Sequence, residues 1–217
     1  DEADIFRLIV KQTVDMLGIK RAFISKIDEA EPDVAHTVAV WMHGEFADNF
    51  TYSLKGTPCA NVLIDGECFY PNNLQSLFPK NTNFPKFGED SYWGIALRGA
   101  DGKHIGIIAM LDDKPMAISR HSLSLMKSFA LRASAEMERL KTEEKYQLLF
   151  ERMLDGFALH EIILDEDKRP VDYRFLNVNP AFEKLTGLRA VDVVGKTVLE
   201  VLPGTEKKWI DIYGYVA

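Results

Sequence analysis

The two cysteines are the side chains of this 217-residue chain with the clearest potential for redox or metal chemistry. Cys59 and Cys68 have no histidine or further cysteine near them at the spacing of a metal site. The pattern is typical of two buried thiols in a reducing cytoplasm, with a disulfide or a thioether to a cofactor as the alternatives. Cys59 follows Pro58 at a predicted helix start, where the helix dipole would lower the pKa of a thiol.

Carboxylates and histidines are the next candidates for catalysis. The carboxylates gather at residues 28–31, 112–113 and 165–167, all in predicted turns where solvated charge is the usual state. His121 lacks the following acidic residue of autophosphorylated histidines, and His160 stands alone on a predicted strand. The sequence contains no phosphate-binding glycine loop, helical histidine pair or nucleophile elbow. It therefore predicts a protein that is not an enzyme.

Composition limits the partners. The chain is 47% hydrophobic and 27% charged, which is ordinary for a globular protein, and its length favours two modest domains. A net charge of -7 without a basic stripe argues against nucleic acid. The apolar runs are shorter than the roughly 20 residues of a membrane helix, so we expect no membrane contact. Because the chain begins at Asp1 and not at Met, we expect a fragment of a longer protein.

Residues 177–188 form the most specific motif of the chain. Asn179 stands where a helix N-cap belongs, Pro180 is favoured at the first helical position, and Gly187 can end the helix in the left-handed conformation. Upstream, residues 156–164 and 171–176 read as two strands of a hairpin. The order of these features, a strand followed by Asn-Pro-Ala-Phe and then by Thr-Gly, resembles that of the PAS sensor family.

The PAS resemblance implies a five-stranded sheet, of which residues 148–217 would supply only the N-terminal portion, without its last three strands. Residues 205–216 would form the family's long connecting helix. A reactive cysteine after the motif, as in flavin-binding relatives, does not occur, and His160 is on the first strand and not at a haem-ligand position. Neither cofactor is expected.

The N-terminal part predicts a second domain. A helical apolar stripe runs over residues 5–17 and stops at Gly18. Residues 105–110 are an almost unbroken apolar run, as in a strand with both sheet faces covered, and residues 98–103 form a hairpin turn before it. Strands are predicted over 21–27, 37–42, 49–54, 91–97 and 104–111.

Several short motifs in this part occur in a characteristic order. They are Gly-Thr-Pro-Cys at 56–59, Phe-Tyr-Pro at 69–71, Leu-Phe-Pro at 77–79, and residues 91–97, 101–106 and 112–116. Over about the first 140 residues this order resembles the GAF domains of bacterial signalling proteins. The resemblance implies an antiparallel sheet with helices from both chain ends on one face and a small-molecule pocket on the other. We therefore predict an α+β chain, with a GAF-like sensor domain at 1–140 and a connecting helix within 118–147.

The middle of this domain is rich in aromatic residues, which either line a cleft for a planar ligand or fill a core under long loops. They are Trp41, Phe69, Tyr70, Phe78, Phe84, Phe87, Tyr92 and Trp93. The predicted ligand contacts among them are Trp41, Tyr70, Phe78, Tyr92 and Trp93. The cyclic-nucleotide signature of GAF relatives is not found in the right arrangement, and neither cysteine is followed by the histidine of bilin-binding relatives. The ligand and any cofactor therefore stay unidentified.

Residues 119–153 contain neither glycine nor proline and predict one long helix. Apolar residues at a four-three-four-three spacing form a narrow stripe on it, namely Met126, Ala130, Ala133, Met137 and Leu140. The first half of the stripe can pack on the sheet of the GAF-like domain. Its continuation beyond Glu138 is either a coiled-coil face or a plain spacer, and we favour a parallel homodimer.

Together these features predict a cytoplasmic sensory input region of a bacterial signalling protein. It would bind a small molecule and pass the signal through the helical linker to an output domain of the histidine kinase or cyclic-dinucleotide type. The alternative is a structural dimerisation module that binds no ligand.

Overall fold

The computed structural model describes residues 3–79 and 88–216, so Phe84 and Phe87 lie outside the described residues. The chain divides into two compact units, Asp1–Lys141 and Thr142–Ala217. One long helix, α5 (Arg120–Arg152), contributes residues to both units. Both units combine helices with antiparallel strands, which confirms the predicted α+β class.

The first unit is built on an antiparallel sheet in the order β3-β2-β1-β7-β6-β5, with β4 also paired to β2. Its strands are β1 (Arg21–Ile27), β2 (Val34–Met42), β3 (Glu45–Ala47), β4 (Thr51–Ser53), β5 (Glu67–Tyr70), β6 (Ser91–Arg98) and β7 (His104–Asp112). Each of the five predicted strands has a counterpart here, whereas β3 and β5 were not predicted. Both have at most four residues, too few for an alternating pattern to be recognised.

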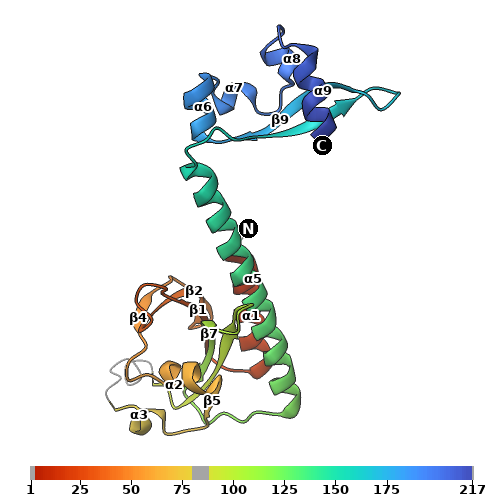
Figure 1. Ribbon diagram of the computed structural model, residues 1–217. Helices are drawn as coiled ribbons and strands as arrows, with labels where there is room; N and C mark the ends of the chain where they lie inside the picture. The colour runs from red at the N-terminus through yellow and green to blue at the C-terminus, as the bar shows by residue number, and fades with distance from the viewer. Residues whose placement is uncertain (1–2, 80–87, 217) are drawn as a thin grey trace. The chain divides into compact units, whose positions relative to one another are not determined.

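Two helices cover one face of this sheet, α1 (Ala3–Leu17) and the first part of α5 (Figure 1). Ile9 and Val10 of α1 are fully buried there, as are Met126 and Ala133 of α5. Helices from the two ends of the domain thus share one face, as the resemblance implied. The apolar run in β7 is buried on both sides, because the other face of the sheet is covered as well.

The predicted stripe on α5 is used inside this unit. Its five residues, Met126, Ala130, Ala133, Met137 and Leu140, all belong to or pack against the core between α5 and the sheet. Gly106 of β7 permits the close approach, because an added Cβ would lie 2.4 Å from the Ser25 carbonyl oxygen and 3.1 Å from the Met137 sulfur. The packing predicted for the first half of the stripe therefore extends to Leu140, and the homodimer stays a prediction.

The opposite face of the sheet carries the short helices α2 (Pro58–Asp65) and α3 (Leu74–Leu77). Pro58 occupies the first turn of α2, and Gly66 ends the helix with a positive φ of 83°. Val62 and Leu74 of these helices are fully buried against the sheet in a second apolar cluster.

The second unit contains a two-stranded antiparallel sheet within the described residues, β8 (Ala158–Leu164) and β9 (Pro170–Val178). The predicted hairpin is therefore confirmed. Its helices are α6 (Pro180–Thr186), α7 (Ala190–Val193), α8 (Val198–Val201) and α9 (Lys207–Val216). They bury Tyr173 and Phe175 of β9 together with Ile210 of α9.

The helix start at Asn179 forms as the motif predicts. The Asn179 side-chain oxygen accepts hydrogen bonds from the backbone N–H groups of Phe182, at 2.9 Å, and Phe157, at 2.8 Å. Its amide group also donates to the carbonyl of Asp155, at 3.0 Å. Gly187 ends α6 with a φ of 74°. Asn179 is therefore both the helix cap and the link between α6 and the segment that enters β8.

Candidate functional site

A cluster of neutral polar side chains lies on the sheet face that carries α2 and α3. Its members are Ser25, Tyr52, Cys59 and Tyr92. The Ser25 hydroxyl lies 3.0 Å from the Tyr52 hydroxyl, and the Tyr52 hydroxyl donates to the Cys59 sulfur at 3.7 Å. The Cys59 sulfur in turn lies 3.2 Å from the Tyr92 hydroxyl. These residues come from β1, β4, α2 and β6, so the contacts join the sheet to the helix above it.

Gly94 makes room for the Tyr92 ring. An added Cβ at Gly94 would lie 2.3 Å from the Tyr92 hydroxyl oxygen and 2.6 Å from a methyl group of Val62. The ring thus lies across its own strand, beneath α2. Tyr92 is 1% exposed and Cys59 is 3% exposed, so solvent does not reach this end of the cluster.

Beside Tyr92 the cluster continues into three partly exposed residues, Asn61, Tyr70 and Phe78. The Asn61 side-chain amide donates to the Tyr70 hydroxyl at 2.7 Å. The Tyr70 ring packs edge-on against Phe78 at 5.1 Å and lies 6.2 Å from Tyr92. Tyr70, Phe78 and Tyr92 are therefore neighbours, as the prediction of a shared aromatic site requires, and Asn61 is a polar residue beside them that the prediction missed.

The two tryptophans of the predicted site lie elsewhere. Trp93 is fully buried on the face covered by α1 and α5, and its indole N–H donates to the Glu67 carboxylate at 3.0 Å. Trp41 packs against the same core, with its ring 4.8 Å from both the Phe46 ring and the Lys11 ammonium. The five predicted contacts are thus split between the two faces of the sheet and do not line one cleft.

The buried polar groups carry no charge at neutral pH. Burial raises the pKa of Cys59, and hydrogen bonds from the neighbouring hydroxyl groups only partly offset the rise. Burial also raises the pKa values of Tyr52 and Tyr92. The predicted lowering of the Cys59 pKa by the helix dipole is therefore wrong, because desolvation of the thiolate outweighs it. A protonated buried thiol is a poor nucleophile.

A buried ion pair lies apart from this cluster, between the start of β1 and the residues that precede β6. The Arg21 guanidinium donates to the Glu89 carboxylate at 3.0 Å, and both side chains are mostly buried. Burial raises the pKa of Glu89 to about 7, against the opposing effect of Arg21. Sequence reasoning missed this pair, because its partners are 68 positions apart.

Within residues 3–79 and 88–216, no group of three or more His, Cys, Asp or Glu side chains is arranged to hold a metal ion. Both cysteines are free thiols. Over the same ranges, no helix combines the length and the apolar character needed to cross a bilayer.

Family comparison matches residues 1–137 to the GAF domain and residues 144–213 to a PAS domain. A comparison with curated protein sequences found no significant match.

Solved structures similar to this chain include several bacterial GAF domains. One is the GAF domain of an Acinetobacter phosphoenolpyruvate-protein phosphotransferase, with 14% identity, a TM-score of 0.53, and coverage of 67% of this chain and 87% of that one. A domain of a putative two-component sensor histidine kinase from Sinorhizobium meliloti has 15% identity, a TM-score of 0.50, and coverage of 66% and 96%. The PixJ GAF domain of Thermosynechococcus elongatus, in its blue-light absorbing form, has 14% identity, a TM-score of 0.54, and coverage of 68% and 91%. At these identities the likeness shows the fold.

Proposed function

Because the chain belongs to the GAF domain family and carries a PAS domain match after it, we propose that it is a sensory input region of a bacterial signal-transduction protein. GAF and PAS domains are sensory and non-catalytic, so the chain would have no reaction of its own. The two-component sensor among the similar structures supports an output domain of that kind. The two free thiols support a cytoplasmic location.

The proposed ligand site is the partly exposed end of the polar cluster, formed by Asn61, Tyr70 and Phe78, with the buried Tyr92 ring behind them. The observation that carries this proposal is the Asn61 to Tyr70 hydrogen bond beside edge-on aromatic rings, a combination of one polar anchor and apolar walls that suits small-molecule sites. The buried groups that adjoin it are neutral, so an uncharged planar molecule would fit better than an anion. Trp41 and Trp93 are not part of this proposal.

The signal would leave the first unit through α5, and a second copy of the chain would pair with the later part of that helix. Tyr146 and Leu149 are three residues apart on one side of α5, and Met153 follows four residues later, directly after the last residue of the helix. They are 70%, 54% and 41% exposed. This stripe lies beyond the residues that pack on the sheet and would form the seam of the proposed parallel homodimer, because apolar residues at this spacing pair between helices.

The alternative is a dimerisation module that binds no ligand. The near-complete burial of Tyr92 and Cys59 favours it, because the chain's own side chains fill that end of the cluster. The two proposals differ at the partly exposed end of the cluster. In a sensor these side chains would move apart to admit a ligand, whereas in a dimerisation module they would stay packed.

A thermal-shift screen of uncharged aromatic compounds distinguishes them. If the chain is a sensor, at least one compound should raise the melting temperature of the wild type. The same compound should not raise that of Asn61→Ala, which removes the polar anchor. Asn49→Ala, at an exposed site, is the matched control and should respond like the wild type. A compound that acts equally on all three proteins would not bind at the proposed site.

A further inference from the structure

The half-buried imidazole of His160 packs among three aromatic rings in the second unit. Its ring centroid lies 4.5 Å from that of Tyr173 and 4.9 Å from that of Phe175, both on β9. The Tyr213 ring of α9 lies 5.5 Å away. Within the described residues, the buried Nε2 atom of His160 has no hydrogen-bond partner. A buried nitrogen without a partner is unusual and calls for an explanation.

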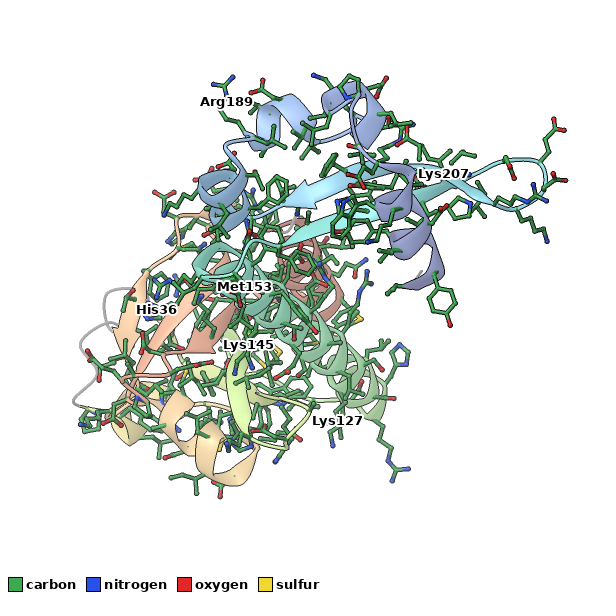
Figure 2. All side chains as sticks on the ribbon, turned by 45° about the horizontal axis from the view of Figure 1, so that its top comes forward. His36, Lys127, Lys145, Met153, Arg189 and Lys207 are labelled. Atoms are coloured by element: carbon green, nitrogen blue, oxygen red, sulfur yellow. The ribbon has the colours of Figure 1, made fainter. Side chains whose placement is uncertain are left out.

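Helix α9 packs closely over this part of the hairpin, and Figure 2 shows the helix running from Lys207 beside the two strands. Ile210 is buried in the core of the unit. At Gly214 an added Cβ would lie 2.3 Å from the Pro170 ring, so only a glycine permits the observed contact. Tyr213 lies between these two anchors, which makes the contact with His160 part of the docking surface of α9.

In the part of the chain that the structure describes, no carboxylate pairs with His160 to balance an imidazolium. Its neighbours from β9 and α9 are the three aromatic rings, of which Tyr173 and Tyr213 carry titratable phenols. The nearby carboxylates are otherwise engaged: Glu161 pairs with Arg174 at 3.9 Å, and an Asp172 oxygen accepts the backbone N–H of Tyr173 at 2.8 Å. Helices α6, α7 and α8 contribute apolar side chains to this core. Burial alone lowers the pKa of His160.

We propose that His160 is a proton-sensitive latch for α9, which holds the helix while the imidazole is neutral and releases it when the imidazole takes up a proton. Aromatic faces attract a cation only weakly, whereas burying an unpaired charge costs more. The protonated ring would therefore leave the aromatic enclosure for water, and Tyr213 would lose its contact. This inference concerns the second unit and goes beyond the ligand site proposed for the first.

The lowered pKa of His160 determines in which direction pH changes the docking of α9. A histidine whose folded pKa lies below the unfolded value of 6.5 stabilises the docked state fully above that pH. The stabilisation is lost as the pH falls below 6.5, and each unit of difference in pKa corresponds to about a tenfold change in the docking equilibrium constant. The latch would thus respond in mildly acidic conditions.

Hydrogen exchange of residues 207–216 in the full chain tests the latch, with rates corrected for the intrinsic effect of pH. We expect protection of α9 in the wild type to fall several-fold between about pH 7.5 and about pH 5. His160→Phe keeps an aromatic ring and cannot be protonated, so its protection should not change. The control, His121→Phe, alters an exposed histidine of α5 and should behave like the wild type.

Two results would overturn the proposal: unchanged protection in the wild type, or an equal loss in His160→Phe. If His160→Phe does not fold, a magnetic resonance titration of the wild type replaces it. The His160 ring signal and the backbone signals of α9 should then change with one midpoint below 6.5. Separate midpoints would show that the proton and the helix are not coupled.

Discussion

The hydroxyl oxygen of Tyr92 lies 3.2 Å from the sulfur of Cys59, in the buried space between β6 and α2. The two residues are 33 positions apart in the sequence, and their contact holds α2 against the sheet. Because both groups stay protonated at neutral pH, the contact is a neutral hydrogen bond and gives no reactive thiolate.

Tyr92 should contribute to stability mainly through its ring. Tyr92→Phe removes only the hydroxyl and should lower the free energy of unfolding by about 1 kcal/mol. Tyr92→Ala should lower it by about 3 to 5 kcal/mol, because it leaves a cavity. Urea unfolding followed by circular dichroism measures both. Tyr215→Phe, at a side chain 93% exposed, is the control and should stay within about 0.5 kcal/mol of the wild type.

Glu89 should make the first unit less stable as the pH rises from about 4.5 toward about 7. Its carboxyl holds a proton to higher pH in the folded chain than in the unfolded chain, because burial raises its pKa to about 7. Glu89→Gln removes this titration, so the variant should lose less stability than the wild type across that interval. Urea unfolding at several pH values provides the comparison, and parallel pH profiles would contradict the prediction.

The two stripes on α5 predict opposite outcomes for charged substitutions. Tyr146→Glu with Leu149→Glu should give a folded monomer, because both side chains are exposed and belong to the proposed seam. Met137→Glu should instead destabilise the first unit, because it buries an unpaired charge in the core. Light scattering reports the mass and circular dichroism the fold. A wild type that is monomeric would remove the basis for the seam.

Asn179→Ala should destabilise the second unit by about 2 to 4 kcal/mol. The substitution removes a helix cap, worth about 1 kcal/mol, and leaves the Phe157 N–H and the Asp155 carbonyl without their partner. Thr197→Ala at the cap of α8 is the matched comparison, since it removes a cap that makes no such second link, and should cost about 1 kcal/mol. Equal losses for the two variants would show that the links to residues 155 and 157 add nothing.

Local patterns predicted most of the elements, because the signals for them lie within a few residues. Asn179, Pro180 and Gly187 mark both ends of α6, and β1 has the predicted bounds. The candidate site was only partly predictable. Tyr92 and Trp93 are adjacent on one strand and therefore point to opposite faces, so an aromatic-rich segment does not place its rings together.

The remaining site residues depend on contacts between distant segments. Ser25 and Tyr52 belong to different strands, and Asn61 reaches Tyr70 from a helix. Nothing local distinguishes them from other polar residues. Similarly, the spacing on α5 indicated an apolar stripe whose first half packs on the sheet, but not that this contact continues to Leu140.

The central claim is that the first unit binds a small molecule beside Asn61 and Tyr70. Native mass spectrometry of the purified chain, compared with its mass after denaturation, tests this most directly. We predict a native mass that exceeds the denatured mass by one small molecule, with the excess lost in Asn61→Ala and kept in Asn49→Ala. Equal native and denatured masses in the wild type, with no binding of any uncharged aromatic compound added in excess, would contradict the claim and leave the dimerisation module as the function.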